Sequence, residues 1–302
     1  MEKSNFKMSG GTHMNYLQKN FFLCLLALAA LLYNPSLGLA VPILSSDLAS
    51  FAVLGAAGVT NVPTSTIGGN LGSAPNASVG GGYVFTSGSL QQNTALAQQA
   101  QLDLDAAIVT LNSMANTGGT LGADLTGTIN PGVYDVLAGT TNLSGALILD
   151  GLGSNTAVWD FRFASTFITS TTSSVSVINV GDGSGVGIYW SVGSAATLNG
   201  NAFAGNVLAH DLISSDGNMT LGCGRLLSAT TQVTLIQDTI SLGCAGFANS
   251  GGFDQGVDVG SGGTGGSNGE VVNGVPEPAT FLLLGSGLVG MIALRWRKKT
   301  TV

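Results

Sequence analysis

The chain has 302 residues, of which 44% are hydrophobic, only 8% are charged and 46 are Gly. This composition excludes a disordered chain, which would combine low hydrophobicity with high charge. Residues 41–274 carry two basic against 14 acidic residues, a formal charge of −12 that would repel a phosphate backbone. Short Val, Ile and Leu runs separated by Gly, Ser, Thr and Asn predict many short strands and no nucleic-acid binding.

The first element along the chain is a predicted secretory signal peptide, residues 1–40. An apolar run of 13 residues, 21–33, follows Lys19, and the small residues Gly38-Leu39-Ala40 come next. A basic flank, a short apolar core and a small-residue cleavage site are typical of such peptides, so we expect cleavage after Ala40. Either Met1 or Met14 could be the start. A buried core helix is the alternative, which the flanking residues disfavour.

A folded domain is predicted over residues 41–248, with one helix within 89–114. Apolar residues recur there at spacings of three and four, at Ala97, Ala100, Leu104, Ala107, Ile108 and Leu111. Ser89 is the expected N-cap, and Gly118-Gly119 follow the helix. We expect no second long helix.

The rest of the domain carries a loose repeat of a polar residue, Leu, a small or polar residue and then Gly. The repeat occurs as NLGS (70–73), DLTG (124–127), NLSG (142–145), TLNG (197–200) and TLGC (220–223). Its spacing is irregular, which fits a β-solenoid with rungs of unequal length. The aromatic residues Trp159, Tyr189 and Trp190 are expected in its core, the alternative being exposed rings that stack on sugars.

Several stretches, taken in order, resemble one family. These are FAVLGAAGVTN (51–61), TSTIGGNLGSAP (64–75), NPGVYDV (130–136), LILDGLGSNTAVWDFRF (147–163), IYWSVGSAATLNG (188–200) and GNVLAHDLISSDGNMTL (205–221). Over about residues 43–243 the chain resembles the microbial ice-binding proteins. The resemblance implies a mainly β fold, a right-handed β-helix of triangular cross-section with a long α-helix alongside. It also implies a small capping insertion, to which residues 81–89 would belong.

The activity that this resemblance implies is adsorption to ice through one flat, uncharged face of the solenoid. Thr suits such a face because its hydroxyl bonds water and its χ1 is stiff. The family's Thr-(Ala/Gly)-any-(Thr/Asn) pattern is partly kept, in SAAT (194–197) for example. The expected ice-binding residues are Thr169, Thr171, Ser194, Thr197, Asn199, Asn201, Asn218 and Thr220. The alternative is a surface adhesin or matrix protein on the same fold without ice activity, which Asp216 or Arg225 on that face would favour.

The sequence gives little support to the hypothesis that the protein is an enzyme. The carboxylates are scattered, at Asp150, Asp160, Asp182, Asp211 and Asp238, although two could meet across rungs as a glycosidase pair. His210-Asp211 is expected to be structural, and the turn at 179–185 lacks the bidentate Glu of a calcium loop. We therefore predict no catalytic residue, no metal and no cofactor.

Cysteine usage and the C-terminus complete the prediction. With Cys24 removed, Cys223 and Cys244 form an even pair in an oxidising compartment, so a disulfide is expected, two buried thiols being the alternative. Residues 249–274 are Gly-rich and predicted to be a linker.

Residues 275–302 close the chain with Pro276-Glu277-Pro278, an apolar run at 281–294 and a basic tail. This order resembles the PEP-CTERM sorting signal of Gram-negative bacteria. It implies transient anchoring in the inner membrane, processing by an exosortase, and release to the cell surface or an exopolysaccharide matrix. A plain C-terminal membrane anchor is the alternative.

Overall fold

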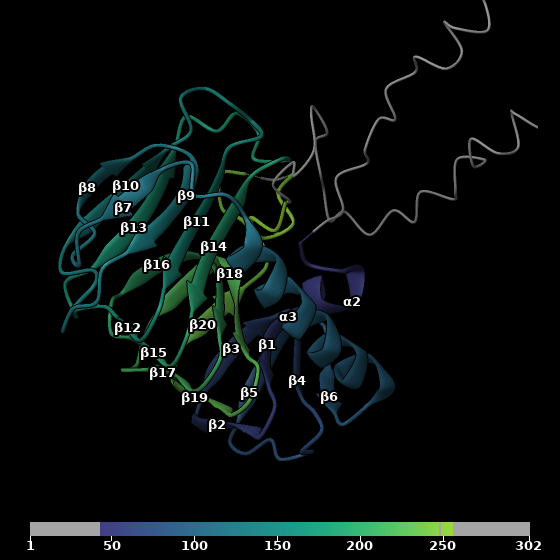
Figure 1. Cartoon of the computed structure of the whole chain (residues 1–302). Coiled ribbons are helices and arrows are strands. Elements are labelled where there is room, and N and C mark those ends of the chain that lie inside the picture. Colours follow the sequence, from purple (N-terminus) through teal and green to yellow (C-terminus); the bar gives the residue numbers. More distant parts are fainter. Residues whose placement is uncertain (1–42, 248, 256–302) are drawn as a thin grey trace, which may run out of the picture.

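The protein is a three-faced parallel β-solenoid with one long helix along it (Figure 1). The computed structural model describes residues 43–247 and 249–255. Within these residues every pairing between named strands is parallel, and the strands form one 15-stranded and one 5-stranded sheet. The mainly β solenoid fold predicted from the repeat is confirmed.

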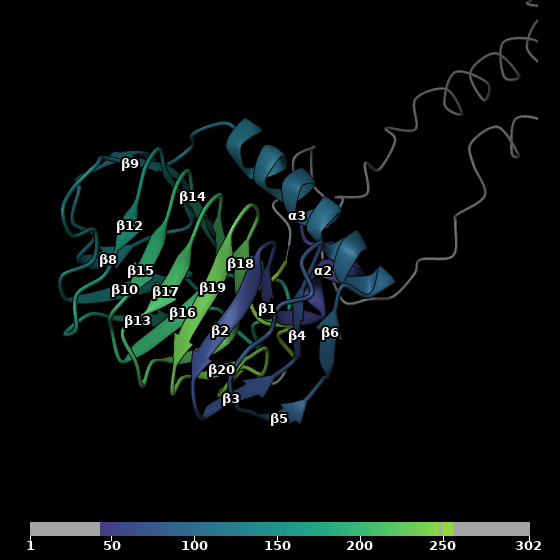
Figure 2. The ribbon, with the colours of Figure 1, turned by 90° about the horizontal axis from the view of Figure 1, so that it is seen from below.

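The turns of the solenoid contribute strands to three faces, and only the five central turns contribute one to the second face. The first face contains, in spatial order, β7 (Gly119–Leu121), β9 (Gly132–Val136), β11 (Val158–Phe163), β14 (Gly187–Val192), β16 (Ala202–Ala209), β18 (Thr220–Ser228), β1 (Phe51–Gly55), β4 (Asn70–Ser73) and β6 (Leu90–Gln92). The second face contains β12 (Phe167–Ile168), β15 (Ala196–Leu198), β17 (Ile213–Ser215), β19 (Gln232–Ile236) and β2 (Gly58–Val62), in the order seen in Figure 2. The third face contains β8 (Gly127–Ile129), β10 (Ala146–Asp150), β13 (Ser174–Ile178), the first residues of β16 and β18, β20 (Thr239–Ser241), β3 (Ser65–Gly68) and β5 (Tyr83–Ser87).

The chain does not climb the solenoid from one end to the other. After the short helix α2 (Ser46–Ala49), β1 lies inside the stack, paired with both β18 and β4. The chain then runs to one end at β6, and α3 (Ala95–Ser113) carries it back towards the far end, where β7 starts the remaining rungs. The last rungs in sequence therefore pack directly against the first ones.

The length of α3 matches this return path. Its 19 residues span about 28 Å. The six strand intervals from β6 to β11 span about 29 Å. At that point Arg162 on β11 donates a hydrogen bond to the Met114 carbonyl that follows the helix, at 2.8 Å.

The predicted apolar stripe of α3 is confirmed, but its predicted start is wrong. Ala97, Ala100, Leu104, Ala107 and Leu111 are buried, and Ile108 is partly buried against the same cluster. The helix begins later than expected, with Thr94 as N-cap accepting from the Ala97 N–H, because Ser89 and the residues after it form the end rung that contains β6.

The capping insertion expected around residues 81–89 is an ordinary rung in the structure. β5 pairs in parallel with β3, and β6 pairs in parallel with β4. These residues therefore extend the ladders of β3 and β4, and they close the end of the solenoid as additional strands.

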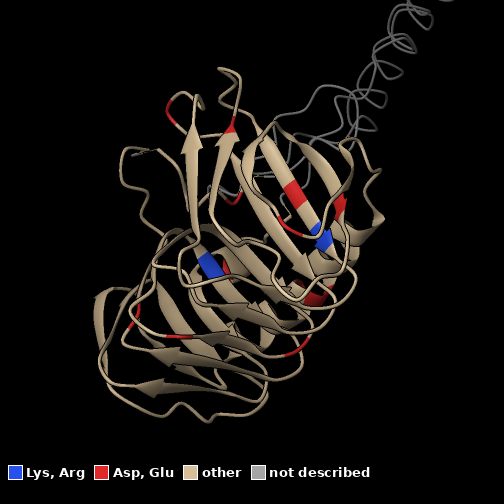
Figure 3. Ribbon diagram, turned by 90° about the vertical axis from the view of Figure 1, so that its left-hand side faces the viewer, with Lys and Arg blue, Asp and Glu red and all other residues tan. Residues whose placement is uncertain are grey.

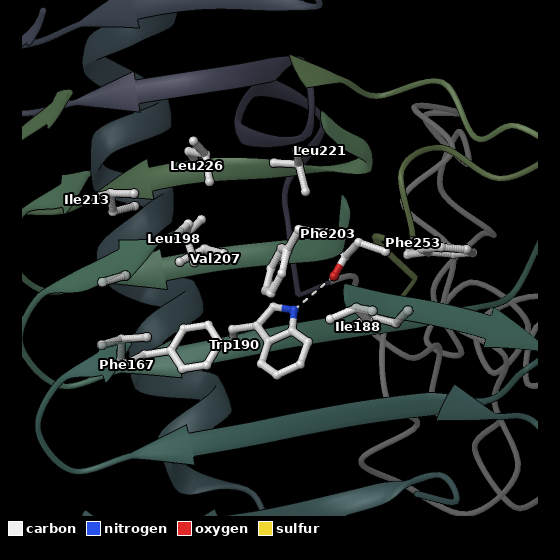
Figure 4. Close-up of a cluster of buried hydrophobic side chains, with 14 of the residues drawn as sticks. Phe167, Ile188, Trp190, Leu198, Phe203, Val207, Ile213, Leu221, Leu226 and Phe253 are labelled. Atoms are coloured by element: carbon white, nitrogen blue, oxygen red, sulfur yellow. Dashed lines mark hydrogen bonds between the residues drawn. The ribbon is translucent and has the colours of Figure 1, made fainter. Parts of the chain in front are cut away.

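Aromatic rings pack among aliphatic side chains in the core (Figure 4). Trp190 stacks on Phe161 with ring centroids 4.7 Å apart and on Phe167 at 5.2 Å. The Trp190 indole N–H donates to the Ala204 carbonyl at 3.0 Å, which satisfies its one polar group. Trp159 and Tyr189 are also fully buried, so the predicted core role of these three aromatics is confirmed.

The predicted disulfide between Cys223 and Cys244 is present. It joins β18 to the segment after β20. No helix within the described residues is long and apolar enough to cross a membrane. The signal peptide, most of the linker and the apolar run at 281–294 lie outside the described residues.

The linker begins later than position 249. Phe253, Asp254 and Gln255 are buried, and the Asn206 amide donates to the Phe253 carbonyl at 2.7 Å. The Arg225 guanidinium, itself buried, bonds Asp254 at 2.9 Å. The prediction that residues 249–255 belong to the linker was wrong. Their Gly-rich composition does not reveal that the buried Arg225 binds this segment.

Candidate ice-binding face

The second face presents a column of hydroxyl-bearing side chains. In β15, β17 and β19 the central residue lies between two buried neighbours, as the period of two requires, and in β2 the exposed Thr60 lies between buried Val59 and half-buried Asn61. Pairing places Ile168 beside Thr197, Thr197 beside Ser214, Ser214 beside Thr234, and Thr234 beside Thr60. Four successive rungs therefore repeat a Thr or Ser at the strand spacing of about 4.8 Å.

Hydrogen bonds within the column hold its side chains in place. The Thr60 hydroxyl donates to the Thr234 hydroxyl at 3.1 Å, and the Ser214 hydroxyl donates to that of Thr197 at 3.4 Å. Because the χ1 angle of Thr is stiff, this arrangement fixes both oxygen and methyl positions. The column is thus a regular, preorganised row of hydroxyl and methyl groups facing water.

The column is flanked mostly by uncharged residues. One flank carries Thr166, Ala195, Leu212 and Gln232, each one residue before an inward-facing core position, and the other carries Asn199, Asp216, Ile236 and Val62. Val62 is 52% exposed, so apolar surface adjoins the hydroxyls. Charged positions on the described ribbon are few and scattered (Figure 3).

A model of the ice-binding-like family matches residues 53–241. An ice-binding protein of Nostoc sp. (strain HG1) is 32% identical over 247 residues, which is 80% of this chain and 82% of that protein. The chain belongs to the ice-binding-like family. The predicted resemblance is confirmed.

Solved structures of family members share the fold. An ice-binding protein from an Antarctic biological consortium is 30% identical, with a TM-score of 0.60 over 67% of this chain and 92% of that one. One from the Antarctic ascomycete Antarctomyces psychrotrophicus is 27% identical, with a TM-score of 0.57 over 68% of this chain and 100% of that one.

Residues 274–298 match the PEP-CTERM protein-sorting motif, which confirms the prediction made from Pro276, Glu277 and Pro278.

The structure does not bring the eight residues expected to bind ice together on one face. On the second face, Thr197 is in the central column, and Asn199 lies on the flank with its amide donating to the Thr169 carbonyl at 2.8 Å. Ser194 lies at a corner and donates to the Asp211 carboxylate at 3.1 Å. Thr169 is buried, and its hydroxyl accepts from the Asn199 N–H, so its inclusion among surface residues was wrong.

The other four lie beyond the second face. Thr220 opens β18 on the third face, between Ala202 and Thr239. Asn218 and Asn201 are exposed just before third-face strands, and Thr171 is exposed in the turn that leads to that face. The structure therefore does not bring these four together with Thr197.

Sequence reasoning missed Thr60, Ser214 and Thr234, three members of the central column. Each lies in a strand of three to five residues, Ser214 and Thr234 between apolar or small neighbours and Thr60 between Val59 and Asn61. That alternation was a usable signal, although it recurs on every face of a solenoid and does not say which face a strand joins.

Arg225 and Asp216, whose charges would disfavour ice binding on the second face, lie in different places. Arg225 lies on the first face, is 1% exposed, and bonds Ala49, Asn206, Gly251, Gly252 and Asp254 instead of water. Asp216 is exposed on one flank of the second face, beyond Ser215.

The carboxylates considered for catalysis accept hydrogen bonds from neighbouring protein groups. Hydrogen bonds from the Leu152 N–H and the Asn179 amide lower the pKa of Asp150, and those from His210, Thr230 and Ser194 lower the pKa of Asp211. Burial raises the pKa of Asp238, whose carboxylate accepts from the Met219 N–H at 2.9 Å and so braces a turn. No group of three or more His, Cys, Asp or Glu residues in the described part of the chain could hold a metal.

Proposed function

We propose that this protein adsorbs to ice through the second face. The observation that carries the proposal is the column of Thr60, Thr234, Ser214 and Thr197, which repeats a hydroxyl on successive rungs of a rigid sheet. Water molecules bonded to such a row take up positions at the rung spacing, and the adjacent methyl groups restrict their alternatives. Charged side chains would impose their own hydration, so the uncharged column supports an ice-like arrangement.

The relatives support the same activity. The matched proteins from Nostoc and from the two Antarctic sources are described as ice-binding proteins, and this chain shares their fold over most of its described length. No catalytic step is needed, since adsorption alone arrests growth of a crystal surface. We propose that the protein is not an enzyme and uses no cofactor.

The ends of the chain support an activity outside the cell. We propose export by residues 1–40, transient anchoring in the inner membrane by residues 281–294, and cleavage by an exosortase near the sorting motif. The solenoid would then act at the surface of a Gram-negative bacterium, held in an exopolysaccharide matrix. Fractionation of expressing cells, with and without Pro276-Glu277-Pro278, tests this route.

The ice proposal is tested in a nanolitre osmometer with residues 41–255, comparing Thr234→Tyr with Thr239→Tyr. Both positions lie on strands of the solenoid and carry the same side chain, but Thr234 is in the second-face column and Thr239 is on the third face. We expect faceted crystals and a freezing gap from the parent, loss of most of the gap in Thr234→Tyr, and little change in Thr239→Tyr. Equal loss in both variants would argue against the second face as the site.

One observation favours a second function. Asp216 places a carboxylate on a flank of the second face, and a charge there suits an adhesin or matrix protein that no longer binds ice. Round crystals and unimpeded recrystallisation from a folded sample would support that alternative. Under the ice proposal, Asp216→Asn should strengthen adsorption because it removes the one charge beside the column.

A further inference from the structure

A buried carboxylate lies at the corner where the second face turns into the third. Asp238 follows β19 and precedes β20, and it is only 1% exposed. None of the ion pairs among the described residues includes it. Burying such a group costs free energy unless hydrogen bonds satisfy it, so the bonds of Asp238 indicate what it does for the fold.

The Asp238 carboxylate joins its own rung to the preceding one. Its Oδ2 accepts from the Ile236 N–H at 2.9 Å and from the Ser215 hydroxyl, and its Oδ1 accepts from the Met219 N–H at 2.9 Å. The Ile236 N–H also donates to the Ser215 hydroxyl, at 3.1 Å. Because Ser215 ends β17 and Ile236 ends β19, the carboxylate fixes the ends of two strands that are neighbours in the second face (Figure 2).

The backbone of Asp238 extends this connection to the next rung. Its N–H donates to the Ser65 hydroxyl at 2.9 Å, and its carbonyl accepts from the Thr66 N–H at 2.8 Å. The Ser65 hydroxyl in turn donates to the side-chain carbonyl of Asn61 on β2, at 2.8 Å. Asp238 therefore connects three consecutive rungs of the stack, those that contain β17, β19 and β2.

The same three rungs carry most of the hydroxyl column. Ser214 and Thr60 each directly precede a residue of this hydrogen-bond network, and Thr234 lies two positions before one. The column itself consists of two bonded pairs, Thr60 with Thr234 and Ser214 with Thr197. Among the described residues no side-chain hydrogen bond joins one pair to the other, and the Asp238 carboxylate spans that junction from behind, between β17 and β19.

We propose that Asp238 is a positioning residue of the second face and holds the two pairs of the column at one fixed spacing. It acts through Ser215 and Ile236, and it is too deeply buried to touch ice. A carboxylate suits this position because both of its oxygens accept, and three donors converge on it. Small displacements of a supporting group weaken a binding site that depends on regular spacing. The proposal rests on ice adsorption through the second face.

The test compares isosteric variants of the full chain, purified in mild detergent, in a nanolitre osmometer. Ser215→Ala removes the hydroxyl that donates to Asp238. Its matched control, Ser191→Ala, removes a hydroxyl that donates to the buried Asp160 on the first face, at 3.0 Å. Ser215 and Ser191 are 5% and 3% exposed, so the two changes remove the same group at a similar depth. Circular dichroism near the freezing point verifies that each sample is folded.

Asp238→Asn is a second variant, which keeps the size of the side chain. Its amide has one accepting oxygen in place of two, so it cannot accept from the Ile236 side and the Met219 N–H at once. We expect Ser215→Ala and Asp238→Asn to lose most of the freezing gap while they stay folded. Ser191→Ala and Asp160→Asn should keep the gap of the parent. An equal loss in these controls, or an undiminished gap in Asp238→Asn, would overturn the proposal.

Amide hydrogen exchange, followed by mass spectrometry without ice, separates this proposal from ice adsorption itself. Exchange should become faster in Asp238→Asn within peptides that cover β17 and β19, and it should stay unchanged in peptides that cover β14 on the first face. A parent chain without a freezing gap would contradict ice adsorption. In that case faster exchange at β17 and β19 would still support the hold of Asp238 on the column, and unchanged exchange would overturn it.

Discussion

The carboxyl group of Asp160 should make the solenoid less stable as the pH rises through neutrality. Asp160 is fully buried on β11, where Oδ1 accepts a hydrogen bond from the Ser191 hydroxyl at 3.0 Å and Oδ2 has no hydrogen-bond partner. Burial raises its pKa from 3.8 to about 7, against the opposing effects of the Ser191 bond and the Arg162 charge. The neutral acid is therefore the form that the fold prefers.

The sign of the effect follows from this raised pKa. Below pH 3.8 the group is protonated in both states and costs nothing, and the penalty grows until the pH passes the folded pKa of about 7. A shift of about three units at about 1.36 kcal/mol each gives a full penalty near 4 kcal/mol. Between pH 5 and pH 8 the free energy of unfolding should fall by about 3 kcal/mol from this group alone.

Asp160→Asn keeps the size of the side chain and removes its ionisation. Equilibrium unfolding in urea at pH 5 and pH 8, followed by the fluorescence of the buried tryptophans, gives the stability change for each protein. We expect most of the wild-type difference to vanish in Asp160→Asn and to persist in Asp182→Asn, whose carboxylate is exposed and has a lowered pKa. An unchanged pH dependence in Asp160→Asn would refute the reasoning.

Three further changes have expected effects on stability, each measured by denaturant titration at fixed pH. Arg225→Met should destabilise the fold by about 3–5 kcal/mol, because it leaves the Asp254 carboxylate buried without its cation, and no loss would mean that the pair is dispensable. Replacing Cys223 and Cys244 by Ser should cost about 3 kcal/mol under oxidising conditions and nothing in a reductant, given their separation of 21 residues. Thr94→Ala should cost about 1 kcal/mol through loss of the α3 cap, whereas Ser89→Ala, at the position first predicted, should cost little.

Local pattern was enough to predict the class of fold but not the path of the chain. The apolar stripe of α3 and the Leu-centred repeats are local, so the helix and the solenoid could both be read from the sequence. The pairing of β1 with β18 joins segments from opposite ends of the domain's sequence, and no local sequence pattern predicts it. The mistaken cap at Ser89 has the same origin, since a polar residue before an apolar run suits an end rung as well as a helix start.

The face was harder to predict than the fold because a solenoid repeats the same alternation on all three sides. Thr197, Thr169 and Thr220 look alike in sequence, yet one faces water on the second face, one is buried and one belongs to the third face. Corner turns decide which side a strand joins, and these turns differ in length from rung to rung. At one corner Gly205, with φ of +98°, lies where β16 crosses from the third face to the first, and the register of β16 against β18 shifts by one residue there.

Arg225 shows why the end of the domain could not be placed by composition. Its guanidinium donates hydrogen bonds to the carbonyls of Gly251 and Gly252, at 2.8 and 3.2 Å, and pairs with the Asp254 carboxylate. A glycine-rich segment is attractive to such a cation because bare backbone can approach it closely, and a Cβ at Gly252 would come within 2.8 Å of the guanidinium. The glycines that predicted a linker thus form the closing contact of the fold, and the sorting signal is attached to a domain whose last described residues are fixed to its core.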